Sequence, residues 1–478
     1  MSEIPDFFDK ELKEEISNLI DIQENILFKN ISVEEEDELI KGLASKGYCL
    51  DSKFPHLLNI SLVYRPKNAH FIKSVITYLN QNLNESYQNI KKYIFTPCSS
   101  IDPNYFHILI GLVHLLRICF DANLINFSEI ASFCHQLLNE KRTYRVHLIL
   151  LYLWFMREFE NDDQKFSSDL FYFSFKKSKS LIISDVVNYY LDNKKTLKND
   201  NWKVFEELIT TGYESSSIQG YIVADDCESL QRIISSSTNF RWNKKLEISL
   251  YDPISTLFNE INILNLAAIN RSTNCFKYIY LNCPPDQKKF VFPDSFDASI
   301  IGGDTDMIHL IEQVPEAFQE SIAFPRPKRS IAYAALFHRQ EILEWLISTK
   351  EYEINEDAIQ YAGKSGFALF FVRYFSKIGK FTYDDIVPLM YFHHFTLFKF
   401  VMKSKKYDIN SASRYGWTAL HYAAANGWID ELKFICEQEG VDFNAKNSDN
   451  KTAIDCAQTT EKTVSIDIIN EALSKQKQ

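Results

Sequence analysis

Histidines are the residues of this sequence that most invite a catalytic or metal-binding interpretation. His421, taken alone, resembles a catalytic histidine, and Thr418 stands three residues before it. The pair His393 and His394 is the sharpest candidate metal site. Adjacent residues on a helix point about 100° apart and do not converge on one ion, whereas metal-binding pairs stand three or four residues apart. We therefore expect His393 and His394 to lie in a turn or on the surface, with no metal bound.

Other chemical motifs give no support to catalysis. The nine cysteines are scattered and no two form a C-x-x-C pair, which excludes a zinc ribbon and a small disulfide scaffold. The sequence also lacks Gly-x-Gly-x-x-Gly, a complete Walker-type phosphate loop, Gly-x-Ser-x-Gly and His-Glu-x-x-His. We expect a protein that is not an enzyme and that holds no cofactor, with its cysteines as reduced core thiols.

Charge and hydropathy exclude further classes of protein. A formal net charge of −11 disfavours nucleic acid as a partner, because nucleic acid requires a basic surface. The N-terminal residues MSEIPDFFDKELKEEI are acidic and predict no secretory signal. The apolar runs Ile108–Phe120 and Leu148–Met156 are too short to span a bilayer and predict buried helices. We expect a cytoplasmic protein without membrane insertion, with the nucleus as the alternative location.

A repeat in the second half supplies the elements that position these residues. The stretch Thr418–Ala423 recurs as Thr452–Ala457, 34 residues later, and Tyr407–Asn410 recurs as Val441–Asn444 at the same offset. Thr418 can cap the free amides of a helix, and Gly427 can end it with a sharp reversal. Leu420, Ala423 and Ala424 then form a narrow apolar stripe at helical spacing. One such unit cannot bury its apolar face alone, so it requires neighbours.

The pattern Gly-x-Thr-Ala-Leu-His-x-Ala-Ala-x-x-Gly, followed by a Leu-x-x-Ile helix, resembles the ankyrin repeat. The resemblance is clearest for residues 413–445 and 447–473. It implies units of about 33 residues, each a β-turn and two antiparallel helices. Alanine replaces the proline usual after the threonine, and Asn450 stands where a hairpin glycine is usual. The resemblance assigns structural roles, with a hydrogen-bonding histidine, to Thr418, Leu420, His421, Ala423, Ala424, Gly427, Thr452 and Ala457.

Fainter copies upstream share the turn between the two helices. They predict eight units from about residue 205 to 478, including SIQGYIVADDCESLQRII, ILNLAAINRSTNCFKYI and SIAYAALFHRQEILEWLI. The stretch Phe324–Ser330, with Arg326, Lys328 and Arg329, contains two prolines that predict a connecting loop. Nuclear import or phosphate binding is the alternative interpretation of its basic residues.

Residues 1–200 lack the repeat and predict a separate helical domain. We expect helices near 9–29, 33–46, 67–82, 104–121, 127–138, 142–159 and 183–192. Tyr64-Arg65-Pro66 marks a helix boundary, and Ser32–Leu39 reads as a capped helix start. The arrangement resembles divergent ankyrin-repeat proteins abundant in some protists, which carry a helical N-terminal domain of unknown function. The fold expected is an all-α ankyrin solenoid (205–478) preceded by a helical domain (1–200).

The ankyrin resemblance implies a scaffold that binds other proteins through its hairpin tips and first helices. Exposed Tyr, Trp and Arg are enriched at interface hot spots. The candidate partner-binding residues are Arg414, Tyr415, Trp417, Tyr422, Asn426, Trp428, Ser448, Asp449 and Lys451. The alternative for the two tryptophans is packing against the neighbouring repeat. We expect a monomeric, non-catalytic interaction scaffold; the alternative is an adaptor or unrecognised enzymatic module in residues 1–200 that the repeats target.

Overall fold

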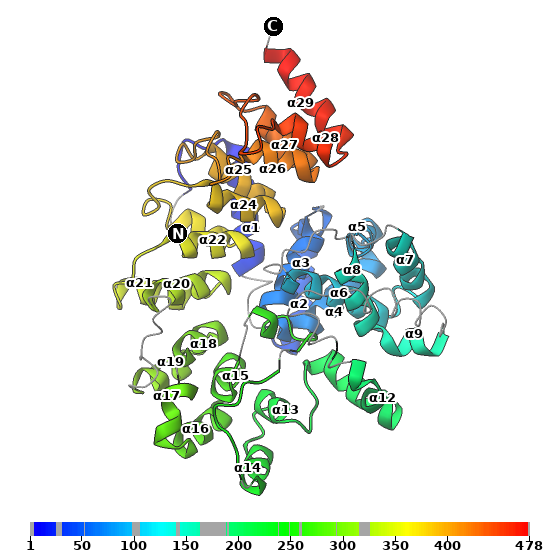
Figure 1. The fold of residues 1–478 in the computed structure, drawn as a ribbon, viewed down its shortest axis with the longest axis vertical. Coiled ribbons are helices and arrows are strands. Elements are labelled where there is room, and N and C mark those ends of the chain that lie inside the picture. Colours follow the sequence, from blue (N-terminus) through cyan, green and yellow to red (C-terminus); the bar gives the residue numbers. More distant parts are fainter. Residues whose placement is uncertain are drawn as a thin grey trace. The chain divides into compact units, whose positions relative to one another are not determined.

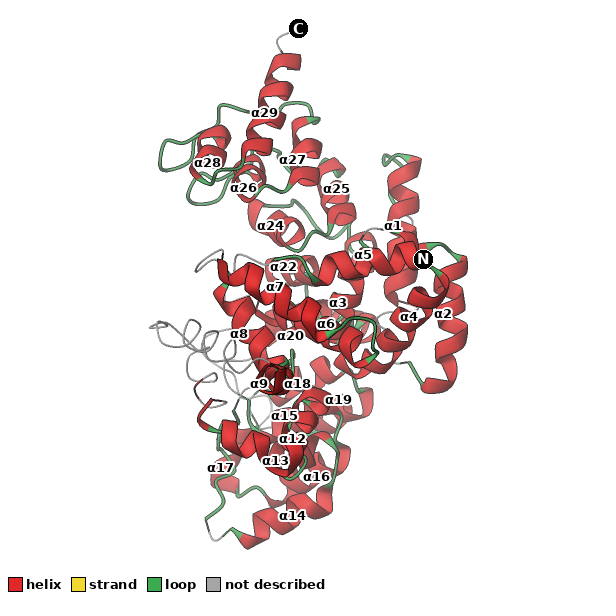
Figure 2. Ribbon diagram, turned by 90° about the vertical axis from the view of Figure 1, so that its right-hand side faces the viewer, coloured by secondary structure: helices red, strands yellow, loops and turns green. Residues whose placement is uncertain are grey.

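The chain is helical in every part that the structure describes. A computed structural model describes residues 4–24, 31–51, 53–97, 106–139, 144–162, 188, 191–237, 239–247, 249–257, 261–292, 294–314 and 326–476. These residues form no β-strand, and their β-type pairing consists of three isolated bridges (Figure 2). The all-α prediction is confirmed. None of the described helices has the length and apolar character needed to cross a membrane.

Two compact units divide the chain. The middle unit is Ile26–Gln319, and the terminal unit joins Met1–Asn25 to Glu320–Gln478. The first helix of the chain therefore belongs with the last repeats. These units are groups of residues that contact one another, and they need not coincide with the domains expected from the sequence. The domain boundary expected near residues 200–205 therefore remains a prediction.

The N-terminal part of the middle unit is a cluster of helices in which α3 packs against α6. Ser32 and Glu35 form a capping box just before α2, and α3 ends at Tyr64 before Arg65-Pro66, both as predicted. Helices α3 and α5 were not anticipated, and the expected helix at 183–192 falls mostly outside the described residues. The helices are α2 (Glu36–Ser45), α3 (Phe54–Tyr64), α4 (Ala69–Asn82), α5 (Asn84–Ile94), α6 (Phe106–Asp121), α7 (Phe127–Asn139), α8 (Arg145–Trp154), α9 (Met156–Asp162) and α12 (Lys194–Thr211).

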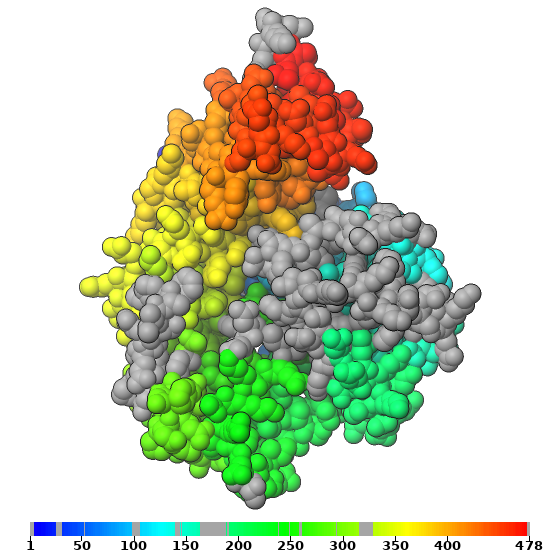
Figure 3. All heavy atoms as spheres, in the orientation of Figure 1, coloured from blue at the N-terminus to red at the C-terminus, as the bar shows by residue number. Residues whose placement is uncertain are grey.

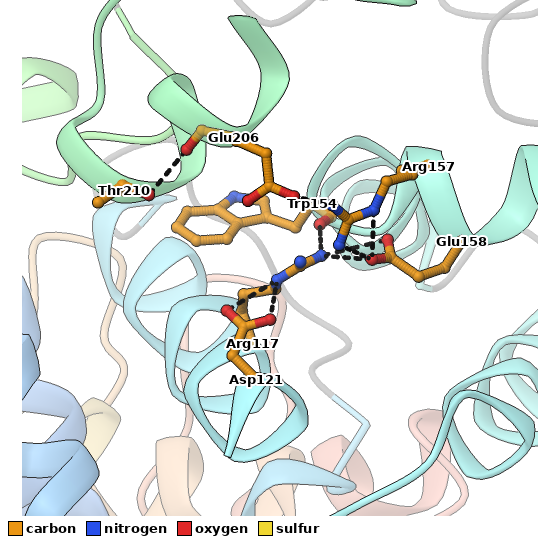
Figure 4. Close-up of polar contacts among 7 residues, drawn as sticks. All are labelled: Arg117, Asp121, Trp154, Arg157, Glu158, Glu206 and Thr210. Atoms are coloured by element: carbon orange, nitrogen blue, oxygen red, sulfur yellow. Dashed lines mark hydrogen bonds and ion pairs between the residues drawn. The ribbon is translucent and has the colours of Figure 1, made fainter. Parts of the chain in front are cut away.

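A charged network is buried among these helices. Arg117 in α6 is 2% exposed, and its guanidinium donates to both carboxylate oxygens of Glu158 at 3.1 Å and to the backbone oxygen of Trp154 at 3.0 Å (Figure 4). Asp121 forms a second ion pair with Arg117, and Arg157 a second with Glu158. A charge removed from water is tolerated only when it is paired in this way. The network therefore explains how the apolar run that was predicted to be a buried helix accommodates an arginine.

Helix pairs occupy all eight places where the sequence predicts a repeat unit (Figure 1). Within each unit, neighbouring first helices pack on one another, as α15 does on α18 and α20 on α22. Three pairs lie in the middle unit: α13 (Ile218–Val223) with α14 (Cys227–Ser236), α15 (Ile263–Asn270) with α16 (Thr273–Asn282), and α18 (Ser295–Gly302) with α19 (Thr305–Glu312), with α17 (Pro285–Val291) between the last two. Five lie in the terminal unit: α20 (Arg326–Leu336) with α21 (Gln340–Ser348), α22 (Glu356–Ser365) with α23 (Ala368–Arg373), α24 (Tyr383–Tyr391) with α25 (Phe395–Lys403), α26 (Ala419–Asn426) with α27 (Ile429–Cys436), and α28 (Ala453–Thr459) with α29 (Thr463–Gln476).

The predicted loop at Phe324–Ser330 is corrected for its described part. Helix α20 begins at Arg326, so Lys328 and Arg329 are helical rather than connecting residues. Pro327 is the second residue of α20, where the helix does not require a backbone N–H and where the fixed φ of proline suits the first turn. Phe324 and Pro325 lie outside the described residues.

The turn inside every helix pair uses one residue with left-handed backbone. Its φ ranges from +50° at His338 to +74° at Gly303. Only three of the eight are glycine, which has no Cβ and adopts this conformation freely. The eight residues are Asp225, Arg271, Gly303, His338, Gly366, His393, Gly427 and Glu461.

Candidate protein-binding surface

The loops before α26 and α28 are tight hairpins joined to each other. In the first, the backbone N–H of Ser413 donates to the oxygen of Trp417 at 2.8 Å, and Gly416 takes φ +71°. In the second, Asn450 takes φ +59° at the position where glycine is usual, because asparagine tolerates left-handed backbone. The N–H of Ser448 donates to the oxygen of Tyr415 at 2.9 Å. Figure 2 shows these loops extending on one side of α26 and α28.

His421 holds the start of α26 and links it to the next repeat. Its Nδ1 accepts from the backbone N–H of Thr418 at 3.3 Å and lies 2.9 Å from the Thr418 hydroxyl oxygen. The proton is thereby assigned to Nε2, which donates to the Lys451 carbonyl oxygen at 3.1 Å. Burial lowers the pKa of His421, so the neutral ring that makes these bonds is favoured. Thr452 and Asp455 form the equivalent capping box before α28.

The remaining predicted structural residues line the packing face of these helices. Ala423, Ala424 and Ala457 are fully buried, and Leu420 is nearly so. Small side chains let α26 and α28 approach closely, and these two helices are in contact. Gly427 ends α26 at φ +73°.

An aromatic pocket lies beside the first hairpin and the first helices. Its volume is about 530 Å³, and we call it the aromatic surface; it is lined by Tyr383, Asp384, Ser413, Arg414, Tyr415, Trp417 and Tyr422. The Tyr422 ring stands nearly perpendicular to two others, with centroids 5.7 Å from Trp417 and 6.2 Å from Tyr383. Arg414 lies over the Tyr415 ring at 4.7 Å. In the space-filling view the repeats that carry it are yellow-orange to orange (Figure 3).

The predicted partner-binding residues separate into two groups by their surroundings. Tyr415 is 56% exposed, Arg414 is exposed, and Trp417 and Tyr422 are half-buried in the wall of the pocket. Trp428 instead packs edge to face against Tyr391 and His393 of the preceding repeat. The others lie outside the pocket lining: Asn426, Ser448 and Asp449 are exposed, and Lys451 is half-buried with its ammonium donating to the Thr459 hydroxyl at 3.2 Å.

Three lining residues were missing from the sequence-based set: Ser413 of the first hairpin, and Tyr383 and Asp384. Tyr383 and Asp384 open α24, the most divergent of the eight first helices. A signal was present, because Thr382 and Asp385 form a capping box with the spacing of Thr452 and Asp455. Burial raises the pKa of Tyr383 above its usual range, with the nearby Tyr422 adding to the effect, so its hydroxyl stays protonated.

His393 and His394 make separate contacts. His393 lies in a turn, and its Nδ1 is 3.3 Å from a carboxylate oxygen of Glu431. His394 is buried rather than exposed, and its Nε2 donates to the Lys364 carbonyl oxygen at 3.2 Å. Within the described ranges, no group of three or more His, Cys, Asp or Glu side chains is arranged to hold a metal ion.

Two comparisons relate parts of this chain to known proteins. A family model for ankyrin repeats, in three copies, matches residues 389–472. Cortactin-binding protein 2 of Mustela putorius furo is 43% identical over 49 residues. That match covers 10% of this chain and 3% of the relative, so the chain corresponds to only a small part of that protein. The matched region contains α26, α27, α28, the first part of α29 and both hairpins described above, whereas Tyr383 and Asp384 precede it.

Proposed function

This chain is an ankyrin-repeat protein, and we propose that it is a non-catalytic scaffold or adaptor that binds a partner protein through the aromatic surface. Ankyrin repeats are protein–protein interaction modules. The observation that carries the proposal is the pocket of about 530 Å³ walled by Trp417, Tyr422 and Tyr383, with Arg414 and Tyr415 at the adjoining hairpin. Trp, Tyr and Arg are enriched among the few residues that dominate the binding energy of protein interfaces. We propose further that the protein acts as a monomer in the cytoplasm.

The alternative, an enzymatic or adaptor module in residues 1–200, has less support. The charged side chains around Arg117 are satisfied by one another and by backbone oxygen, as expected of a structural network. His147 is buried and His114 is half-buried, and burial lowers their pKa values to about 3 and about 4, which keeps both rings neutral. Such groups stabilise packing more readily than they exchange protons with a substrate.

The experiment is affinity capture with the full chain, followed by binding measurements with the purified partner. Replacing both Tyr415 and Trp417 by alanine should weaken binding by about 2 kcal/mol, roughly 30-fold, because hot-spot residues contribute on this scale. Phe290→Ala is the matched control, since Phe290 is an aromatic residue 58% exposed elsewhere in the repeats. Hydrogen exchange should show unchanged protection in α26–α29. An unchanged partner set with unchanged affinity for the double variant would reject this surface.

A further inference from the structure

The N-terminal segment packs on the repeats rather than on the helices that follow it in sequence. Helix α1 (Lys10–Ile22) contacts α23 and α25, within the terminal unit. Asp9 caps α1 by accepting from the N–H of Leu12 at 2.8 Å. Leu12, Ile16 and Ile22 are buried, while the other face is acidic and polar. The second helices of neighbouring repeats thus form a groove that an amphipathic helix occupies.

An aromatic cluster anchors the first end of the segment. Phe8 is 5% exposed and stacks on Phe400 of α25 with ring centroids 4.6 Å apart. Phe375 meets Phe7 and Phe8 at 6.0 Å and 6.3 Å. Aromatic pairs at these separations contribute beyond the area that they bury.

Charge complementarity continues along α25. Glu15 pairs with Lys399 and also accepts from the Thr396 hydroxyl at 3.2 Å. Asp9 pairs with Lys403 at 2.7 Å, and this hydrogen bond lowers the pKa of Asp9. Two lysines of α25 therefore pair with two acidic residues of the segment, and these acidic residues stand six positions apart in the sequence.

Gln23 fixes the other end through backbone groups. It is fully buried, its Nε2 donates to the Gly366 oxygen at 2.7 Å, and its Oε1 accepts from the Ala368 N–H at 3.0 Å. The Ala368 N–H belongs to the first turn of α23, where the helix itself offers no acceptor. Because the Gln23 amide bonds to one backbone acceptor and one backbone donor of the same turn, the N-terminal segment has to lie in a single register along α23. Hydrophobic packing alone would not impose this.

We propose that the groove between α23 and α25 is a helix-binding site, separate from the aromatic surface, and that residues 5–24 are its intramolecular ligand. The partner chemistry that it fits is an acidic amphipathic helix with aromatic side chains before it and a glutamine after it. This is the helix-in-groove mode of peptide recognition. Because the ligand belongs to the same chain, its effective concentration is high, and a competing helix has to displace it. The site is therefore held closed by the N-terminal segment.

The test uses a fluorescent peptide of residues 4–24 and the full chain. A full chain carrying Phe8→Ala and Gln23→Ala holds its own segment weakly, so the peptide should bind it at least tenfold more tightly than it binds the wild-type chain. Hydrogen exchange of α26–α29 confirms that the variant is folded. Equal affinity for both chains, or no binding to either, would overturn the proposal.

A charge exchange checks the register. In the Phe8→Ala, Gln23→Ala chain, a Glu15→Lys peptide should bind at least fivefold more weakly, and adding Lys399→Glu to the chain should restore binding. Absence of that rescue contradicts the assigned groove. Light scattering of the wild-type chain distinguishes the source of the segment: a dimer that dissociates when Phe8 and Gln23 are replaced assigns the occupant to a second copy and overturns the intramolecular form.

Discussion

In the repeat of α26 the turn after the first helix is made by a glycine, Gly427, whereas in five repeats it is made by a residue that has a Cβ atom. Both kinds of turn have the same left-handed backbone conformation. Gly427 takes φ +73°, while His338, His393 and Arg271 take +50°, +53° and +60°. Left-handed backbone costs a residue with a Cβ about 1–2 kcal/mol relative to glycine. The turn therefore requires the conformation, and glycine is only the least costly way to reach it.

The non-glycine turn residues use their side chains to join the next repeat. In four of the five, a side-chain atom makes a polar contact with the helix pair that follows. These contacts are Asp225 Oδ1 with the Cys275 N–H at 2.9 Å, Arg271 Nε with the Gly302 oxygen at 2.8 Å, His338 Nε2 with the Ser365 oxygen at 3.2 Å, and His393 Nδ1 with Glu431 Oε1 at 3.3 Å. The fifth, Glu461, has no helix pair after it in the described chain. Backbone strain at these turns is offset by contacts between repeats.

Alanine at two of the turn glycines should give the largest difference between repeats. A Cβ at Gly366 would lie 2.4 Å from a carbon of the buried His394 ring, whereas one at Gly427 would meet the flexible Lys462 side chain at 3.1 Å. Gly366→Ala should cost about 3 kcal/mol or more, from backbone strain and displacement of the ring. Gly427→Ala should cost about 1 kcal/mol. Urea unfolding with helix-resolved hydrogen exchange measures both. Similar losses would show that His394 does not pack as described.

Acid should destabilise the repeats around His394 next. Burial lowers the pKa of His394 from 6.5 to about 4. Between pH 6.5 and pH 4, His394 binds a proton in the unfolded chain but not in the folded chain. The free energy of unfolding is therefore unaffected by protonation of this residue above pH 6.5 and falls as the pH drops toward 4. The loss from this one residue is on the order of 3 kcal/mol. Unfolding at pH 7 and pH 4.5 should show a smaller acid loss for His394→Gln, whose amide can still donate to Lys364. An unchanged acid loss in that variant would assign the effect to other histidines.

The sequence predicted the positions of all eight helix pairs. It did so because alanine pairs in the first helix and the turn between the helices are still recognisable in repeats that have lost the rest of the motif. It found the hairpin residues around Trp417 for the same reason. It missed Tyr383, since the helix that carries it keeps only a capping box. It also could not place α1, whose Gln23 contacts Ala368, 345 residues away. No local pattern in a single sequence encodes a contact over that distance, nor shows that His338 replaces a glycine in backbone geometry.

Glycine placed at two non-glycine turns should give the smallest effects, and effects of opposite sign. Glu461→Gly removes the strain of φ +58° at an exposed residue whose side chain has no later helix pair to contact within the described residues, so stability should rise by about 1 kcal/mol. His338→Gly removes similar strain, but it also loses the hydrogen bond to Ser365 and the stacking of the imidazole on Phe367 at 4.1 Å. Leaving a cavity at a buried side chain outweighs the relieved strain, so a net loss of about 1–2 kcal/mol is expected. Urea unfolding of the two variants beside the wild-type chain decides the matter. If both changes stabilise the protein, the contacts of the His338 side chain with the next repeat do not contribute to stability. The non-glycine turns would then carry backbone strain that the turn at Gly427 avoids, with no compensating contact.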